Sequence, residues 1–372
     1  MRCDADVLIA GGGPAGLATA ILARQAGFDV IVAEPRTAPV DKACGEGLMP
    51  AALAALARID VDPAGREFAG ITYVSGARRV DARFRTGVGR GVRRTVLHDA
   101  LHARAFDVGV RFIDERITAV QQTADHVRAS CTRSPAAEPS AISGVTSSFV
   151  RPLRGDAADL GGLTARWLVA ADGLHSPLRA ALGLQRPTRH APRWGLRAHH
   201  EIAPWSDTVE VHWAAHSEAY VTPVADDLVG IAVLTSKPGP YAEQLAAFPS
   251  LAARVQDETA TSVRGAGPLR QNVHRRVAGR VLLVGDAAGY VDALTGEGIA
   301  VSLHSAEALV RCLVAGRPED YEGEWRRVSR SYRVLTHGLL FAAERRLLRP
   351  TIVPAAAALP KVFAEVVHRL GG

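Results

Sequence analysis

The stretch DADVLIAGGGPAGLATAILARQAGFDVIVAEP, Asp4–Pro35, decides the fold of this chain. It holds two short, continuously apolar segments, separated by a glycine-rich turn and an Ala- and Leu-rich segment that ends at Gly27. Continuous rather than alternating apolar runs are typical of parallel strands, which are buried on both faces. The stretch therefore predicts a β-α-β unit at the start of an α/β domain.

The turn GGGPAG has the GxGxxG spacing of a dinucleotide site. Glycines there permit a tight turn, a close approach to a pyrophosphate and close helix packing, while the helix N-terminus faces the anion. Glu34 ends the second strand, where an acid accepts hydrogen bonds from a ribose diol, which favours FAD or NAD over NADP. The predicted contacts are Gly11, Gly13, Pro14, Ala15, Gly16 and Glu34.

A second junction of this kind occurs far downstream, in GDAAGYVDALTGEGIAVSLHSAEAL, Gly285–Leu309, which follows the apolar run VLLV. Asp286 is placed to bind a polyol, and Gly296 and Gly298 start a new helix. A helix N-terminus favours a ring that becomes anionic on reduction. A nicotinamide dehydrogenase needs no second clamp, so the two junctions predict FAD, with its adenosine diphosphate at the first and its ribityl chain and ring at the second.

The composition restricts the function classes. The chain has 372 residues with 44 basic and 38 acidic side chains, a net charge of +6 and no long basic run, which argues against a nucleic-acid partner. Its four cysteines are scattered, without CxxC spacing or paired histidines, so we expect no metal site and a reducing compartment. No signal-peptide pattern and no apolar run of about 20 residues is present, which predicts a cytoplasmic protein.

Changes in pattern along the chain predict an α/β architecture: a Rossmann-like FAD-binding domain, interrupted by a β-rich substrate domain and followed by a helical tail. A Ser-, Pro-, Ala- and Gly-rich stretch without periodicity predicts a flexible excursion. Prolines 350, 354 and 360 are expected to break the tail, which caps the core or touches lipid through an apolar face. The predicted limits are 1–68, 92–186 and 270–330 for the FAD-binding domain (excursion 133–165), 69–91 and 187–269 for the β-rich domain, and 331–372 for the C-terminal helices.

The stretch ADGLHSPLR, Ala171–Arg179, follows another apolar strand. Ser176 is a good N-cap and Pro177 suits the first helical position, so in isolation the stretch predicts a helix start.

As an ordered set, the motifs resemble the FAD-dependent hydroxylases of the p-hydroxybenzoate hydroxylase fold. They are GGGPAG, Glu34-Pro35-Arg36, Arg94-x-x-Leu97, Ala171-Asp172-Gly173 and Gly285-Asp286. The resemblance covers most of the chain outside the excursion and the tail. It implies FAD near Arg36, Arg94 and Asp286, and an aspartate–glycine motif at Asp172 that serves both FAD and an incoming NAD(P)H.

Two stretches are more similar to the geranylgeranyl reductase branch: KACGEG, Lys42–Gly47, and the second junction itself. Glu46 replaces a glycine of that branch, Asp292-Ala293 replaces Asn-Pro, and the substrate-side aromatic motif survives only as YVTPV, Tyr220–Val224. The halogenase pattern of two tryptophans before a proline is absent. The remaining implied cofactor contacts are Pro35, Cys44, Gly45, Gly285, Gly296, Gly298 and Ile299.

Cys44 and Glu46 are the catalytic candidates. Cys44 either faces the flavin or is a small residue in a glycine-rich turn, and Glu46 is either a general acid/base or a solvated loop carboxylate. His175, His199 and His200 are expected to be hydrogen-bonded structural residues. The expected walls of the substrate pocket are Trp213, Tyr220 and Pro223.

The leading functional hypothesis is an NAD(P)H-dependent monooxygenase that oxidises an apolar or aromatic, phenolic or polyketide-like small molecule. The alternative is a reductase that delivers a hydride to a carbon–carbon double bond of an isoprenoid or other apolar substrate, with Cys44 or Glu46 supplying the proton. A non-catalytic protein with a flavin fold is the remote third, since Arg36, Arg94 and Asp286 are all retained beside both glycine loops.

Overall fold

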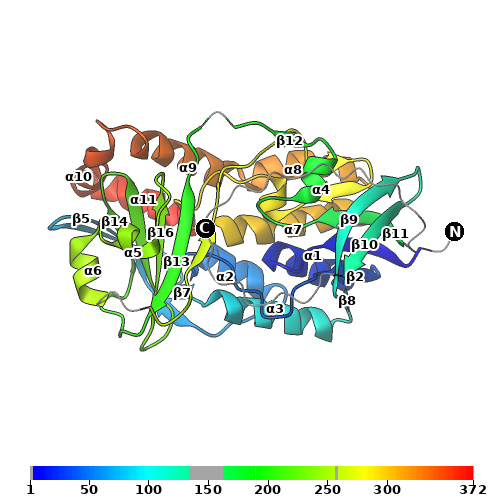
Figure 1. Cartoon of the computed structure of the whole chain (residues 1–372), viewed down its shortest axis with the longest axis horizontal. Helices are drawn as coiled ribbons and strands as arrows, with labels where there is room; N and C mark the ends of the chain where they lie inside the picture. Colours follow the sequence, from blue (N-terminus) through cyan, green and yellow to red (C-terminus); the bar gives the residue numbers. More distant parts are fainter. Residues whose placement is uncertain (1–2, 134–161, 189, 256–258, 372) are drawn as a thin grey trace.

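The computed structural model describes residues 3–133, 162–188, 190–255 and 259–371, which form two large sheets and the helices around them (Figure 1). The first sheet has the strand order β19-β20-β11-β1-β2-β8, with β10 paired to β11 and β9 to β10. Its strands are β1 (Ala5–Ala10), β2 (Val30–Ala33), β8 (Arg111–Ile113), β9 (Glu115–Gln122), β10 (Val127–Arg133), β11 (Leu163–Ala170), β19 (Val277–Ala278) and β20 (Val281–Leu283).

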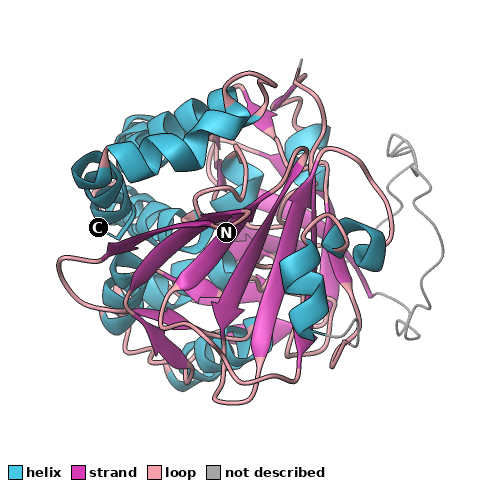
Figure 2. Ribbon diagram, turned by 90° about the vertical axis from the view of Figure 1, so that its left-hand side faces the viewer, coloured by secondary structure: helices cyan, strands magenta, loops and turns pink. Residues whose placement is uncertain are grey.

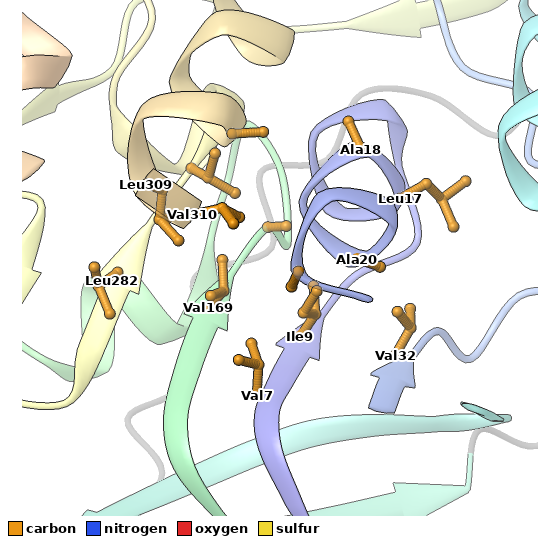
Figure 3. Packing of buried hydrophobic residues seen from close by; sticks show 14 of the residues in the cluster. Val7, Ile9, Leu17, Ala18, Ala20, Val32, Val169, Leu282, Leu309 and Val310 are labelled. Atoms are coloured by element: carbon orange, nitrogen blue, oxygen red, sulfur yellow. The ribbon is translucent and has the colours of Figure 1, made fainter. Parts of the chain in front are cut away.

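The centre of this sheet is parallel: β1 pairs with β2 and β11, and β11 pairs with β20. Helices α1 (Pro14–Gln25) and α7 (Gly298–Val314) lie side by side against these strands (Figure 3). Val7, Ile9 and Val169, between the helices and the strands, are completely buried. The predicted β-α-β unit and the parallel strand expected after Arg280 are confirmed.

The second sheet has the order β17-β13-β16-β15-β14-β5-β6. Strands β5 and β6 form an antiparallel hairpin, and β5 pairs in parallel with β14. The predicted α/β fold class, with its separate β-rich part, is therefore confirmed, while the predicted domain limits stay predictions. The strands are β5 (Gly70–Ser75), β6 (Arg78–Arg83), β13 (Trp194–His200), β14 (Val209–Trp213), β15 (Ser217–Pro223), β16 (Val229–Thr235) and β17 (Arg264–Ala266).

Helices lie on both sides of the second sheet (Figure 2). One face, with Ala219 and Ile231, packs under α5 (Tyr241–Leu245) and α6 (Pro249–Val255). The other face, with Tyr73 and Trp213, packs against the C-terminal helices. These helices are α9 (Arg330–Ala343), α10 (Ile352–Ala358) and α11 (Pro360–Gly371).

Shorter elements connect these layers. The remaining strands are β3 (Gly47–Leu48), β4 (Arg66–Phe68), β7 (Gly89–Gly91), β12 (Gln185–Arg186) and β18 (Asn272–Val273). The remaining helices are α2 (Pro50–Ala57), α3 (Arg94–Asp107), α4 (Pro177–Ala181), α8 (Tyr321–Val328) and the 3₁₀ turns η1 (Gly285–Ala288), η2 (Pro318–Asp320) and η3 (Arg349–Thr351).

Two sequence-based expectations need correction. Pro354 does not break the tail, because it lies in the first turn of α10, where its missing N–H leaves no helical hydrogen bond unmade. The predicted excursion at 133–165 is too long at its end, because β11 begins at Leu163 and pairs with β10. Residues 134–161 of that excursion lie outside the described residues.

The tail packs on the core. Phe363 and Val367 of α11 are buried against the second sheet. Within the described residues, no helix alone has both the length and the apolar character that a membrane crossing requires. Arg349–Ala358 and Pro360–Arg369, bent by 104°, meet that test as a pair by length and composition only.

Strand β14 of the second sheet carries an acid, Glu210, whose titration should change the stability of the protein. Burial alone would raise the pKa of Glu210, but hydrogen bonds from His212, Arg79 and Trp205 outweigh it and lower the pKa to about 2. A carboxyl group whose pKa is lower in the folded state stabilises the protein at pH values above its unfolded-state pKa. That stabilisation is lost as the pH falls toward the folded-state pKa. We expect a loss of about 1–2 kcal/mol in the free energy of unfolding between pH 5 and pH 2.5 from this group, after allowance for solvent screening.

Chemical denaturation at a series of pH values measures this effect. The Glu210→Gln variant lacks the titrating group and should lose less stability than the wild type over the same interval. Equal losses in the two proteins would contradict the assignment.

Candidate functional site

The first glycine turn is closed to any side chain at two positions. Gly11 has φ +104°, and a Cβ placed there would lie 2.5 Å from the carbonyl oxygen of Ala171. A Cβ on Gly16 would lie 2.0 Å from the carbonyl oxygen of Gly11. The turn therefore needs both glycines so that strand β1, helix α1 and the end of β11 can meet.

Glu34 lies against this turn, as the sequence predicts. Its Oε2 accepts a hydrogen bond from the backbone N–H of Gly12 at 2.9 Å, and Arg36 donates to both carboxylate oxygens at 2.7 Å. Burial opposes ionisation of Glu34, but the Arg36 guanidinium and the Gly12 N–H hold its pKa below the ordinary value. A carboxylate is thus present at the end of β2 at neutral pH.

The second glycine junction is in direct contact with the first. Gly285 has φ +62°, and a Cβ there would lie 2.6 Å from the Cβ of Ala15 in helix α1. Gly296 also has a positive φ, +71°, and Gly298 is the first residue of α7. Two segments far apart in the sequence therefore form one continuous site. The prediction of a single cofactor that spans both junctions requires this contact.

Charged side chains from several segments surround the contact between the junctions. Burial raises the pKa of Asp286, and the nearby cations Lys42, Arg94 and Arg179 oppose this rise. Burial lowers the pKa of Lys42, and the neighbouring Arg36 adds to that effect. Lys42, from the KACGEG loop, thus interacts electrostatically with Asp286 of the second junction and with Arg36 of the first.

The buried polar atoms of this region that lack a partner among the described residues include Nη1 of Arg94 and Oδ1 of Asp172. The Arg94 guanidinium lies over the glycine turn, with Nη2 3.9 Å from a Cβ built on Gly13. The second oxygen of Asp172 accepts a hydrogen bond from the Leu178 N–H at 3.1 Å. A buried guanidinium with an unused donor beside a glycine turn at a helix N-terminus fits a pyrophosphate, so these residues suit FAD.

Several other residues of the predicted cofactor motifs lie at the start of a helix or next to a residue already described. Pro14 is the first residue of α1, and Ser176 caps α4 with Pro177 at its first position, as expected. Ile299 is half-buried against the main core, and Pro35 lies between Glu34 and Arg36. Their contact with FAD stays a prediction.

Sequence reasoning missed Glu297, which precedes α7. Burial raises its pKa to about 8, with a smaller opposing effect from Thr295. Its Oε2 lacks a hydrogen-bond partner among the described residues. A carboxyl group that is mostly protonated at neutral pH therefore lies at the start of the helix that faces the second junction.

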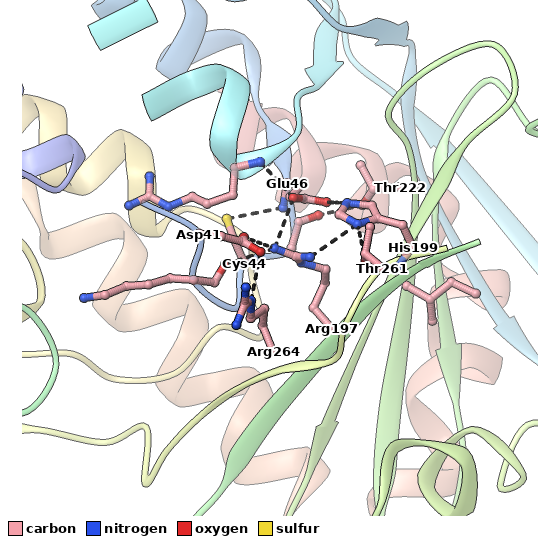
Figure 4. Close-up of polar contacts among 12 residues, drawn as sticks. Asp41, Cys44, Glu46, Arg197, His199, Thr222, Thr261 and Arg264 are labelled. Atoms are coloured by element: carbon pink, nitrogen blue, oxygen red, sulfur yellow. Dashed lines mark hydrogen bonds and ion pairs between the residues drawn. The ribbon is translucent and has the colours of Figure 1, made fainter. Parts of the chain in front are cut away.

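In the KACGEG loop, Cys44 and Glu46 belong to a cluster of polar side chains (Figure 4). Glu46 is only 3% exposed and adopts φ +59°, a conformation that favours the glycine it replaces. Its carboxylate accepts a hydrogen bond from the Arg94 N–H at 2.8 Å and contacts His199 Nε2 at 2.7 Å. The alternative of a solvated loop carboxylate is therefore wrong.

The cluster continues across β13. Arg197 pairs with Asp41 and lies 3.7 Å from Glu46, and Arg264 binds Asp41 at 2.9 Å. The other ring nitrogen of His199 contacts Thr261 at 2.9 Å. Nothing in the sequence motifs indicated Asp41, Arg197 or Arg264, because their spacing along the chain has no local pattern.

Cys44 contributes a neutral thiol to this region. Burial raises the pKa of Cys44, Arg94 lowers it and Glu46 raises it further, with burial dominant. The Glu46 N–H lies 3.4 Å from its sulfur. The thiol therefore keeps its proton at neutral pH, unlike the activated thiolates of nucleophilic cysteines.

The three residues predicted to wall the substrate pocket make contacts within the protein, and their role as pocket walls stays a prediction. Tyr220 donates a hydrogen bond to the Leu294 carbonyl at 2.6 Å, and Trp213 packs on Tyr73 with ring centroids 5.4 Å apart. The carbonyl of Pro223 approaches Gly91. A cavity of about 570 Å³ opens beside Asp286, Gly298 and Tyr332, and none of the three predicted residues lines it.

The other two histidines that the sequence predicts to be structural are hydrogen-bonded, as expected. His175 contacts the Gly267 carbonyl at 3.0 Å and His200 contacts the Tyr241 hydroxyl at 3.0 Å.

Two glycine junctions in contact, an acid at the end of β2 and a buried arginine over the turn define a dinucleotide-binding flavoenzyme. The chain belongs to the FAD binding domain family, whose model matches residues 4–317. It is an FAD-dependent oxidoreductase, and the resemblance to the hydroxylase fold and its geranylgeranyl reductase branch is confirmed.

Among curated proteins, the chain is 26% identical to the menaquinone reductase of Mycolicibacterium smegmatis over 87% of its own length and 80% of that protein. It is 25% identical to digeranylgeranylglycerophospholipid reductase 2 of Methanosphaera stadtmanae, over 81% of this chain and 76% of the relative. Among solved structures, it resembles the flavin-dependent brominase Bmp2 with a TM-score of 0.75 and 18% identity, over 99% of this chain and 93% of the other, which shows the shared fold.

Proposed function

We propose that this protein reduces a carbon–carbon double bond of an isoprenoid or other apolar substrate. The observation that carries the proposal is the neutral Cys44 thiol beside Arg94, in the loop whose Lys42 neighbours Asp286. Adding hydrogen to a double bond requires a hydride and a proton. A protonated thiol can supply the proton, whereas a hydroxylase needs no acid of this kind on the substrate side.

FAD would be held at both junctions, by Gly11–Gly16, Glu34 and Arg94 at the first and by Asp286 with the start of α7 at the second. Bound FAD, once reduced by an external two-electron donor such as NAD(P)H, would supply the hydride. The protein positions the cofactor and the substrate and provides the proton. Cys44 gives its proton to the carbon that does not receive hydride, and solvent protons restore the thiol afterwards.

Glu46 and His199 position this thiol. The Glu46 backbone N–H points at the sulfur, while its side chain links the loop to α3 through the Arg94 N–H and to β13 through His199. Holding Glu46 at positive φ costs of order 1–3 kcal/mol, which these contacts offset. The cluster therefore fixes the loop rather than leaving Cys44 free to move.

The names of the curated relatives support this reaction class. Both the menaquinone reductase and the digeranylgeranylglycerophospholipid reductase are reductases whose substrates carry isoprenoid chains, and each aligns with more than three quarters of its length. We infer an apolar, isoprenoid-bearing small molecule as the substrate class of this chain.

The Cys44→Ser variant tests the proton donor. A serine hydroxyl is a far weaker acid, and general acids contribute about 10²–10⁴ in rate, so we expect the turnover number to fall about 100-fold. FAD content, read from flavin absorbance, should stay within about a fifth of the wild-type value. Cys131→Ser, a change in β10, serves as the matched control and should leave turnover intact. Unchanged turnover in Cys44→Ser would rule out the thiol as the essential acid.

A monooxygenase is the second candidate, and the buried Arg197–His199 pair on β13 favours it. Cationic and hydrogen-bonding side chains on that strand suit an ionised phenolic substrate, and the aromatic motif of the reductase branch is reduced to YVTPV. An anaerobic single turnover with prereduced protein separates the two reactions. We expect reduced product from menaquinone or a geranylgeranyl lipid without oxygen. Product that forms only when oxygen is admitted, and contains an oxygen atom from it, would overturn the reductase in favour of the monooxygenase.

A further inference from the structure

The cavity of about 570 Å³ lies between β18, the turn after η1, the first turn of α7 and helices α8 and α9. Its charge is strongly one-sided. Asp286 is the single acidic side chain that the described part of the chain contributes to its lining. The basic side chains are Arg186, His190, Arg270, Arg276, Arg333 and His337.

Most of these cations form no close ion pair. Within the described ranges, Arg186, Arg270, Arg333 and His337 form no ion pair and no side-chain hydrogen bond. Arg276 differs, because it binds Glu322 at 2.9 Å. Burial and the repulsion of Arg270, Arg333 and His190 lower the pKa of His337, while Glu344, which is outside the cavity lining, raises it. Asp292, also outside the lining, attracts Arg270. An anion placed between the cations would relieve their repulsion.

The cavity also has an apolar side. Tyr290, Val291, Trp325 and Tyr332 contribute to its lining, and Arg276 lies 3.7 Å above the Trp325 ring. Gly298, the first residue of the 17-residue helix α7, reaches the same space, and a helix N-terminus favours negative charge. The cavity therefore offers cationic side chains and aromatic surface to one ligand.

We propose that this cavity binds a phosphate or diphosphate group attached to an apolar or aromatic body. Arginine guanidinium groups are suited to phosphate oxygens because they donate in pairs. The volume is sufficient for a diphosphate with part of the attached group, since ligand pockets commonly span about 300–1,000 Å³.

This ligand is not the diphosphate of FAD. That group is assigned to Gly11–Gly16 and Arg94, none of which lines the cavity. The cavity reaches the FAD site only at the second junction, through Gly285, Asp286 and Gly298. The bound molecule is therefore a second ligand whose other end approaches the flavin end of the site.

Calorimetric titration of the FAD-loaded protein with inorganic diphosphate, at about 0.15 M salt so that weak surface attraction is screened, tests the proposal. The Arg270→Gln/Arg333→Gln double variant should bind diphosphate at least tenfold more weakly than the wild type. Arg330→Gln is the control, because it removes an exposed charge from the same helix outside the cavity and should change affinity less than twofold. No binding by the wild type, or equal weakening by the control, overturns the proposal.

The single Arg333→Gln variant, with a smaller expected loss, keeps the test decisive should the double variant fold poorly, as judged from FAD content and melting temperature. Competition then distinguishes the sources of the group. Displacement by geranylgeranyl diphosphate but not geranylgeraniol indicates a prenyl diphosphate, and displacement by ADP indicates a nucleotide. Failure of both to displace inorganic diphosphate would overturn the apolar or aromatic body. Because binding is measured without turnover, an inactive reductase assay leaves this inference standing, and the reverse holds as well.

Discussion

The Gly16→Ala protein is expected to purify with less than a tenth of the wild-type FAD. The new Cβ would lie 2.0 Å from the Gly11 carbonyl oxygen, a backbone atom that no side-chain rotation can move. Helix α1 would have to shift away from the turn, and forced overpacking of this kind costs about 1–3 kcal/mol. Since the turn amides must converge on the cofactor diphosphate, we expect at least a 100-fold loss of FAD affinity, equivalent to about 2.7 kcal/mol.

Flavin absorbance per mole of protein after dialysis, followed by titration with added FAD, measures this loss. Gly338→Ala in α9 is the matched control, because a Cβ at that position meets no atom within 4 Å. The control should hold the full complement of FAD. A Gly16→Ala protein with the same flavin absorbance as the wild type would show that the first junction does not bind the cofactor.

The second large effect concerns stability. Arg193 is nearly buried and joins two buried carboxylates, Glu218 at 2.7 Å and Asp292 at 3.0 Å. Arg349 also binds Glu218, at 2.7 Å, and so ties the C-terminal region to β15. Replacing Arg193 with methionine keeps the apolar volume but leaves Asp292 without its cation. Breaking a buried pair in this way costs about 3–5 kcal/mol in the free energy of unfolding.

Urea denaturation of Arg193→Met measures this loss directly. Arg83→Met is the surface counterpart, since Arg83 and Asp207 are 61% and 62% exposed and pair at 2.8 Å. Exposed pairs contribute about 1 kcal/mol or less, so the control should unfold close to the wild type. Similar small losses in both variants would mean that the buried network contributes no more than a surface ion pair.

Much of the cofactor site could be predicted because its signals are local. Gly11 and Gly16 are required by a positive φ and by close backbone contacts, and both requirements fall within one turn of chain. Glu34 can be predicted from its position at the end of β2, and the Ser176 cap from the Ser-Pro pair at the start of α4. Even the pairing of two distant junctions could be predicted, since parallel strands bring their carboxyl ends to one edge of a sheet.

The substrate pocket is much harder to predict from the sequence. Trp213, Tyr220 and Pro223 were chosen by residue type, yet Trp213 packs on Tyr73 and Tyr220 holds the Leu294 carbonyl. The strands that carry them alternate between two covered faces, so their pattern does not distinguish a pocket from a core. The cationic cavity has no local sequence signal for a related reason: its arginines come from three separate segments.

The sequence by itself determined that the chain is an α/β flavoprotein with two glycine junctions, because tight turns and buried parallel strands restrict residue type over short stretches. Only the tertiary structure decided that Glu46 is buried against His199, that Cys44 keeps its proton, and that a group of arginines faces an open cavity. Burial and charge proximity depend on segments that fold together from distant parts of the chain, and no local pattern records them.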